Sequence, residues 1–247
     1  MSRGASGKWY VVFSCEVEDK PISGRLAAVG VDLGLNNLVT LSDGTVFMAP
    51  RKCRGAEERL GWAQRSLSRK MRGSGNREKA RLKVARLHER VAYQRRDYAY
   101  KTARSIVNSY ERIYLEDLKI QSMQGNRCLS KSIADAGWGL LRNALTYMAR
   151  LSEGVMAFVD PRGTNQVCSG CGAVVGKDLS VRIHCCPWCG LTVDRDVNAA
   201  RNVLKRGLEI GLGRAEYRPD GEGTATQLCE AGQVASVKQE AHDFSHG

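Results

Sequence analysis

Four of the nine cysteines form two Cys-x-x-Cys pairs with spacing typical of a metal site. Cys168-Ser-Gly-Cys171 and Cys186-Pro-Trp-Cys189 are separated by fourteen residues, and a glycine follows each pair. Each pair brings two thiolates within reach of one ion, and the glycine permits the tight turn around it. The spacing therefore predicts a structural, tetrahedral zinc site. The alternative, free buried thiols, would not require two such pairs.

Two neighbours of these cysteines are predicted to lie outside the zinc shell. Cys185 would break the two-residue gap, which only Cys186 provides. We interpret His184 as a strand residue, because four sulfurs already complete a tetrahedral shell.

Three carboxylates far apart in the sequence stand at the predicted ends of strands or the start of a helix. They are Asp32, Glu116 and an acid within Asp194-Arg-Asp-Val-Asn198. The ends of neighbouring strands converge, so these acids could form one cluster. Such a cluster suits Mg²⁺, and two such ions can hydrolyse a phosphodiester. Taken singly, each acid is more often a turn former or a helix cap.

Apolar stretches and turn signals predict the elements that would position these acids. A continuous apolar run over 26–32 favours a strand buried on both faces, in the middle of a sheet. A Ser-Asp-Gly turn after 38–41 leads into 45–47, which predicts a meander. Aromatic, β-branched and helix-spaced residues predict further elements. The further strands are 8–18, 112–118 and 154–159, and the helices are 138–151 and 197–208.

Residues 51–108 account for the whole net positive charge of the chain and predict a helical hairpin. The segment holds 18 Lys and Arg against five acids, whereas the whole chain has a formal charge of +12. Gly73-Ser-Gly-Asn76 divides it into two helices. Residues 121–135 are polar and predict a loop. From residue 211 onward, low apolar content predicts a disordered tail.

The composition of the chain favours a polyanionic partner. A pI near 9.4 and the absence of an apolar run of transmembrane length indicate nucleic acid rather than a membrane. A merely soluble basic protein is the alternative. The N-terminal residues lack the apolar region of a secretory signal, so we expect a reducing, cytoplasmic location with cysteines as thiols or metal ligands.

Three blocks of the sequence resemble the nuclease motifs and zinc ribbon of the TnpB (OrfB) proteins of prokaryotic insertion sequences, relatives of the type V, Cas12-like CRISPR effectors. The first two are Val29-Gly-Val-Asp-Leu-Gly34 and Ile113-Tyr-Leu-Glu-Asp-Leu118. The third runs from Thr164-Asn-Gln166 through the cysteine pairs to Asp194-Arg-Asp-Val-Asn198 and Asn202.

This resemblance implies an α/β, RNase H-like (RuvC) fold, in which a mixed sheet carries a basic helical-hairpin insertion and a Cys₄ zinc ribbon. It assigns Asp32, Glu116 and Asp196 as the catalytic, Mg²⁺-binding acids, with Asp194 as a neighbour that caps the helix. The choice of Asp196 over Asp194 rests on the family pattern alone. The implied activity is Mg²⁺-dependent DNA endonuclease cleavage directed by a guide RNA from the transposon end. The basic residues near nucleic acid would be Arg69, Lys70, Arg72, Arg81, Lys83, Arg86, Arg127 and Lys131.

The resemblance also implies a domain plan and two departures from it. Residues 1–20 are predicted to be a remnant strand of an N-terminal wedge-like domain. The nuclease core is 21–163 with its insertion at 51–108, the zinc ribbon is 164–193, the last motif and helix are 194–210, and the tail is 211–247. TnpB chains usually have a longer N-terminal half, so this chain resembles a truncated copy, and Thr164-Asn-Gln166 stands where Thr-Ser-Gln is more usual.

Two other functions are compatible with the same motifs. One is a non-cleaving nucleic-acid-binding remnant that keeps the fold and the zinc. The other is a transposase that joins DNA ends, for which the sequence shows no tyrosine chemistry. Intact acids in all three blocks favour the nuclease. Without a recognition region, we expect strong binding of nucleic acid with little sequence preference.

Overall fold

The computed structural model describes residues 1–49, 52–120, 123, 136–178 and 180–210, and the chain divides into two compact units. Of the described residues, 1–18 and 59–89 belong to the first unit, and the others belong to the second. The second unit contains the acids Asp32, Glu116 and Asp196 and the four paired cysteines.

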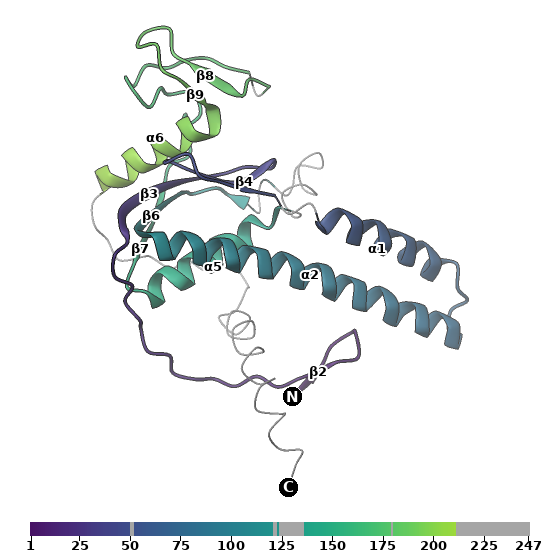
Figure 1. Ribbon diagram of the computed structural model, residues 1–247. Coiled ribbons are helices and arrows are strands. Elements are labelled where there is room, and N and C mark those ends of the chain that lie inside the picture. The colour runs from purple at the N-terminus through teal and green to yellow at the C-terminus, as the bar shows by residue number, and fades with distance from the viewer. Residues whose placement is uncertain (50–51, 121–122, 124–135, 179, 211–247) are drawn as a thin grey trace. The chain divides into compact units, whose positions relative to one another are not determined.

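A five-stranded mixed sheet forms the centre of the second unit (Figure 1). Its strand order is β5-β4-β3-β6-β7. The central strand β3 runs parallel to β6 and antiparallel to β4, and β6 runs parallel to β7. The bounds are β3 Leu26–Leu33, β4 Asn37–Leu41, β5 Val46–Met48, β6 Tyr110–Glu116 and β7 Val155–Val159. The α/β class and the mixed sheet predicted from the sequence are confirmed.

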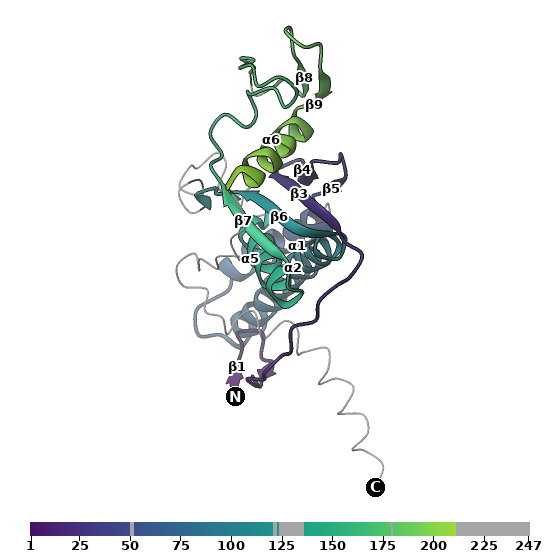
Figure 2. The same ribbon diagram turned by 90° about the vertical axis from the view of Figure 1, so that its left-hand side faces the viewer.

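Helices cover both faces of the sheet (Figure 2). Helix α5, Trp138–Leu151, and the C-terminal part of α2, Gly75–Ser109, cover one face, while α6, Arg195–Ile210, covers the other. Alternation along each strand explains why both faces are apolar, since successive side chains point to opposite sides. The continuous apolar run over 26–32 therefore belongs to a central strand, as predicted.

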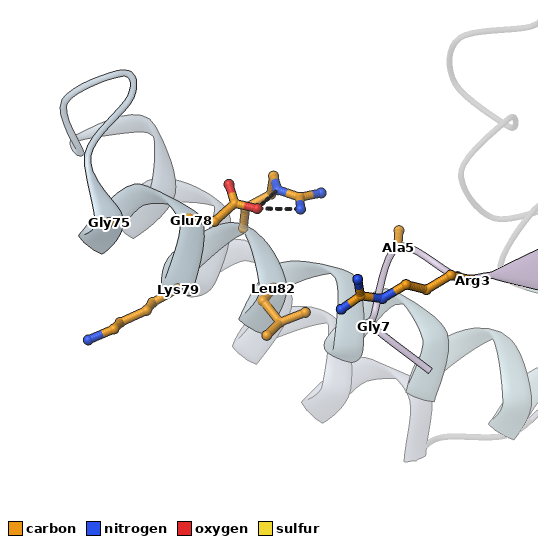
Figure 3. Close-up of a pocket in the computed structure, with 9 residues that line it drawn as sticks. Arg3, Ala5, Gly7, Gly75, Glu78, Lys79 and Leu82 are labelled. Atoms are coloured by element: carbon orange, nitrogen blue, oxygen red, sulfur yellow. Dashed lines mark hydrogen bonds and ion pairs between the residues drawn. The ribbon is translucent and has the colours of Figure 1, made fainter. Parts of the chain in front are cut away.

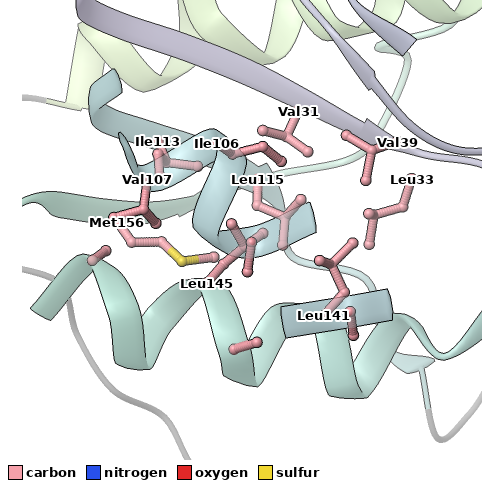
Figure 4. Close-up of a cluster of buried hydrophobic side chains, with 14 of the residues drawn as sticks. Val31, Leu33, Val39, Ile106, Val107, Ile113, Leu115, Leu141, Leu145 and Met156 are labelled. Carbon is pink, nitrogen blue, oxygen red and sulfur yellow. The ribbon is translucent and has the colours of Figure 1, made fainter. Parts of the chain in front are cut away.

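The larger core lies on the α5 side of the sheet (Figure 4). Val31 and Leu115 from neighbouring strands pack there with Ile106 of α2 and with Leu141 and Leu145 of α5. Each of these side chains is at most 1 % exposed. Because Val31 and Leu115 point into this core, the residues that alternate with them along β3 and β6 point to the opposite face, toward α6.

On the opposite face α6 lies unusually close to the sheet. Val203 of α6 packs with Tyr114 and Val159. Gly207 faces the Tyr114 ring so closely that a Cβ at position 207 would lie 2.1 Å from Cγ of Tyr114. Glycine is therefore required at this point of the helix, because any side chain would push α6 away from β6.

The first unit contains the N-terminal hairpin and residues 59–89 of the basic helical segment. Strand β1, Ser2–Arg3, pairs with β2, Trp9–Tyr10. Helix α1, Lys52–Ser68, and α2 are separated by residues 69–74, which confirms the predicted helical hairpin. Glu89 of α2 accepts hydrogen bonds from Ser6 Oγ at 2.9 Å and from the Tyr10 hydroxyl, and its carboxylate lies 2.7 Å from Lys8 Nζ.

The strand predicted over 8–18 is wrong for most of its length. Only Trp9–Tyr10 is paired, and no described strand lies beside 11–18. Strand-forming residues need a neighbouring strand to satisfy their backbone groups, and β1 offers only two residues. The loop predicted over 121–135 falls almost entirely outside the described residues, and the tail 211–247 falls wholly outside them. Among the described helices, none combines the length and apolarity needed to cross a bilayer.

Candidate metal centres

The four predicted cysteines converge on one point. The Sγ atoms of Cys168, Cys171, Cys186 and Cys189 all lie within 4.8 Å of one another. The Sγ atoms are 3.6 Å apart for Cys168 and Cys189, and 3.6 Å apart for Cys171 and Cys186. A zinc tetrahedron with Zn–S bonds of about 2.3 Å has sulfur–sulfur edges of about 3.8 Å. The cluster therefore fits a Cys₄ zinc ion.

Both Cys-x-x-Cys turns have the same backbone form. Gly172 N donates to Cys168 O at 2.9 Å, and Gly190 N donates to Cys186 O at 3.0 Å. Both glycines have positive φ, 80° and 73°, a conformation that other residues rarely adopt. The glycine that follows each cysteine pair therefore closes the turn around the metal.

Local hydrogen bonding prepares Cys186 for metal binding. The backbone N–H of Cys189 donates a hydrogen bond to Sγ of Cys186. This bond lowers the pKa of the Cys186 thiol to about 6, which favours the thiolate. His184 and Cys185 lie on strand β8, Ile183–Cys185, and neither belongs to the cluster. His184 is fully buried beside Lys177 Nζ, and burial, followed by that charge, lowers the pKa of its imidazole. It is thus a strand residue, as predicted.

Asp32 and Glu116 occupy adjacent positions on neighbouring strands. In the parallel ladder, Val31 pairs with Leu115, and the two acids follow directly. Because Val31 and Leu115 point into the α5-side core, alternation turns Asp32 and Glu116 to the α6 side. Both are nearly buried, with exposures of 6 and 5 %.

Asp196 lies in the first turn of α6 and is 8 % exposed. Strand β9, Thr192–Asp194, ends immediately before the helix and pairs with β8. Oδ1 of Asp194 accepts the backbone N–H of Asp196 at 2.8 Å and that of Val197 at 3.4 Å. This is the geometry of an N-cap, in which the side chain satisfies amides that have no partner within the helix.

The pKa of Asp32 responds to both of the other acids. Burial raises it well above its usual value, and the charges of Glu116 and Asp196 raise it further. Burial also raises the pKa of Glu116, while a hydrogen bond from Thr164 opposes that shift. Two arginines lie near the third acid, with Arg195 Nε 3.4 Å and Arg182 Nη1 3.9 Å from Asp196 carboxylate oxygens. Carboxylates whose charges raise the pKa of a neighbour are suited to binding a hard cation.

Three polar residues around this site belong to the third motif block but were not predicted as site residues. Thr164 Oγ1 donates to Glu116 Oε1 at 2.6 Å. Asn202 Nδ2 donates to the backbone oxygens of Thr164 at 2.8 Å and Val167 at 2.7 Å. Asn198 is fully buried, donates to Val167 O at 2.8 Å and accepts from Ser169 N at 2.9 Å. Asn198 and Asn202 are four residues apart on the apolar face of α6, and this pattern of polar residues at buried helical positions was a usable signal.

The predicted nucleic-acid-binding residues fall into two groups. Arg127 and Lys131 lie outside the described residues. The other six are exposed and belong to the first unit: Arg69, Lys70, Arg72, Arg81, Lys83 and Arg86. Arg81 forms an ion pair with Glu78, and Arg86 Nε donates to Ser6 O at 3.4 Å.

A cavity of about 660 Å³ lies in the same unit between the β1–β2 turn and the start of α2 (Figure 3). Its lining includes Arg3, Lys79, Leu82 and the Glu78–Arg81 ion pair. The cavity therefore adds cationic groups to a surface that is already basic.

The mixed sheet and its helices define a RuvC-like α/β fold, to which the chain adds a Cys₄ cluster that fits a zinc ion. A solved structure, of a Cas12f1–sgRNA–target DNA complex, has this fold with a TM-score of 0.53 and 15 % identity, over 71 % of this chain and 49 % of that one. Residues 12–127 match the family model described as "Probable transposase" (OrfB_IS605), and residues 138–203 match the model of the Cas12f1-like TNB domain. These matches, together with the curated relatives below, support assignment of the chain to the TnpB family.

Two curated relatives are more similar in sequence. A "Putative RNA-guided DNA endonuclease" of Streptomyces pristinaespiralis is 39 % identical over 249 residues, which cover all of this chain and 60 % of the relative. "Putative RNA-guided DNA endonuclease InsQ" of Escherichia coli K12 is 35 % identical over 218 residues, which cover 81 % of this chain and 54 % of that protein. The chain thus spans little more than half the length of these relatives.

Proposed function

We propose that this chain is the nuclease part of a TnpB-type, RNA-guided DNA endonuclease that depends on Mg²⁺. The observation that supports this most is the placement of three nearly buried acids, Asp32, Glu116 and Asp196, on the α6 side of the sheet. A buried cluster of like charges is costly unless a cation compensates it. A fold without phosphodiester chemistry would gain nothing from keeping it.

Asp32, Glu116 and Asp196 would hold the metal in this proposal. Mg²⁺, when bound, supplies activation of water and stabilisation of the leaving oxygen. The chain's own residues orient this set, since the ladder fixes Asp32 beside Glu116 and the Asp194 cap fixes the first turn of α6. The Cys₄ zinc has a structural role, because protein sulfurs occupy all four positions.

The partners belong to the same proposal. The solved Cas12f1 relative is a complex with guide RNA and target DNA, and the curated relatives are named RNA-guided DNA endonucleases. We propose DNA as the substrate, a guide RNA from the transposon end as the specificity factor, and the bacterial cytoplasm as the location. The exposed cations of the first unit would contact phosphates, which fix position without reading bases.

The test is a cleavage assay on plasmid DNA with Mg²⁺ or Mn²⁺, with and without RNA from the element's end. Cleavage should require the metal and should disappear in Asp32→Ala, Glu116→Ala and Asp196→Ala, with thermal unfolding showing that each variant folds. Asp160→Ala serves as the control, because this exposed acid lies just beyond the end of β7, outside the cluster. If Asp196→Ala cleaves as well as the unaltered chain, Asp194 replaces Asp196 as the proposed third metal ligand. If the chain binds metal and nucleic acid but cleaves DNA under none of these conditions, the result would instead favour a non-cleaving remnant.

A further inference from the structure

The hydroxyl of Thr164 contacts one carboxylate of the acid cluster directly. Its Oγ1 lies 2.6 Å from Glu116 Oε1, and the two side chains are 1 and 5 % exposed. This distance is typical of a hydroxyl that donates to an ionised carboxylate, a stronger bond than one between neutral groups.

The hydroxyl has a single proton and two acceptors within reach. Oγ1 also lies 3.0 Å from the carbonyl oxygen of Pro161. The shorter distance and the negative charge both favour donation to Glu116. A donor that fixes Oε1 also fixes the plane of the carboxylate, and therefore the direction in which Oε2 points.

Thr164 is itself held in place from α6. Asn202 Nδ2 donates to Thr164 O and to Val167 O, and Asn198 binds Val167 O and Ser169 N. Ser169 lies inside the first Cys-x-x-Cys turn of the zinc ribbon. The hydrogen bonds thus form a continuous connection from the zinc-binding turn, through α6, to the carboxylate of Glu116.

We propose that Thr164 is a positioning residue for Glu116, which orients this carboxylate for the divalent cation, and that Asn202 holds Thr164 in register. The inference rests on the proposed function, in which Glu116 is a metal ligand. Partners that orient metal ligands typically change metal affinity by about 10- to 100-fold when removed.

The experiment compares two substitutions at Thr164 with one at another buried threonine. Thr164→Val removes the hydroxyl and keeps the shape, whereas Thr164→Ser keeps the hydroxyl. Thr146→Val is the matched control, because Thr146 is 6 % exposed in α5 and its hydroxyl binds Arg142 O and Met156 Sδ rather than an acid. Mn²⁺ affinity measured by electron paramagnetic resonance on the zinc-loaded chain is the main readout. Zinc content and thermal unfolding are measured alongside it.

We expect Thr164→Val to weaken Mn²⁺ binding about tenfold or more, and Thr164→Ser and Thr146→Val to leave it within about twofold of the unaltered chain. In a Glu116→Gln background, Thr164→Val should cause no further loss. If the valine variant does not fold, Thr164→Ala removes the same hydroxyl without adding a methyl group and takes its place.

Equal Mn²⁺ affinity in Thr164→Val and the unaltered chain would overturn the inference. A tenfold loss of Mn²⁺ affinity in Thr164→Ser would also overturn it. So would a loss of Mn²⁺ affinity caused by Thr164→Val in the Glu116→Gln background that is as large as in the unaltered chain. The proposed function itself would be overturned if the unaltered chain bound no Mn²⁺, or if Asp32→Ala bound Mn²⁺ as tightly as the unaltered chain. This comparison is made before any Thr164 variant is measured.

Discussion

The carbonyl oxygen of Ala200 occupies the place that a side chain on Gly30 would need. A Cβ at position 30 would lie 2.0 Å from Ala200 O and 2.5 Å from the backbone nitrogen of Leu204. Both obstacles are backbone atoms of α6, which cannot rotate away. Gly30 thus sets the distance between the central strand and the helix that carries Asp196.

Gly30→Ala should therefore destabilise the chain and displace α6. Overpacking typically costs about 1–3 kcal/mol, and backbone obstacles place this site at the upper end of that range. Urea unfolding measures the loss. Gly139→Ala in α5 is the control, because a Cβ there meets nothing within 4 Å and a helical alanine stabilises by up to about 1 kcal/mol. Equal stability of the Gly30 variant and the control would show that α6 can shift without cost.

Replacement of one zinc ligand should release the metal and loosen the start of α6. The zinc-binding unit leads from Cys189 through β9 directly into α6, so its collapse removes the support of Asp194 and Asp196. Metal analysis should find one Zn²⁺ per chain, lost in Cys189→Ser and retained in Cys185→Ser, where the cysteine lies outside the cluster. Full zinc content in Cys189→Ser would contradict the assignment.

Asp32→Asn should stabilise the chain at neutral pH when no Mg²⁺ is present. Burial and the neighbouring acids raise the pKa of Asp32, so the folded state holds a proton that the unfolded state has already released. By linkage, stability then falls as the pH rises from the unfolded pKa of about 3.9 through the raised folded pKa, and stays low above it. The neutral amide avoids that loss.

Urea unfolding at pH 7 and at about pH 5.5 measures this difference. The excess stability of the Asn variant should be larger at pH 7 than at the lower pH, because the loss caused by the Asp32 charge grows as the pH rises toward the folded pKa. Added Mg²⁺ should stabilise the unaltered chain more than the variant. A variant less stable than the unaltered chain at pH 7 without Mg²⁺ would mean that other groups compensate the Asp32 charge.

Substitution of Arg69, Lys70 and Arg72 by Gln should weaken nucleic-acid binding for all sequences alike. These exposed residues join α1 to α2, and none of them forms an ion pair with another described residue. Each phosphate contact adds about 0.9 to the slope of log K against log salt for duplex DNA, so the triple variant should lower the slope by about two to three. Anisotropy titrations at several salt concentrations measure it.

The combined substitution Asp97→Asn with Lys101→Gln is the control for this series. It removes an exposed ion pair of α2 without changing net charge, and Lys101 is not among the predicted nucleic-acid-binding residues. We expect little change in affinity or in the salt slope. A slope that changes as much as in the triple variant would show that the loss of any exposed cation of this segment has the same effect.

Much of the second unit follows from the sequence because its signals are local. The apolar run of β3, the turn before β5 and the spacing of α5 and α6 each depend on neighbouring residues only, and the paired cysteines carry their geometry in their spacing. Thr164 was missed for a different reason. Its partner Glu116 is 48 residues away, and a single threonine beside cysteine pairs carries no sign of that contact.

The failure over residues 11–18 has the same origin. Their aromatic and β-branched residues favour a strand, but a strand exists only where another chain segment can pair with it. Local preference cannot supply that partner. Only Trp9–Tyr10 forms a strand, because its partner β1, Ser2–Arg3, is two residues long.

The order of the acids along the chain has a consequence for biosynthesis. Asp32 and Glu116 leave the ribosome well before Asp196, which stands on the last described helix, after the zinc ribbon. A nascent or prematurely terminated polypeptide that ends before α6 carries the first two acids but lacks the third. If the acids act as proposed, the unfinished polypeptide cannot cut DNA beside the ribosome, and the enzyme matures only after its zinc-binding segment has been synthesised.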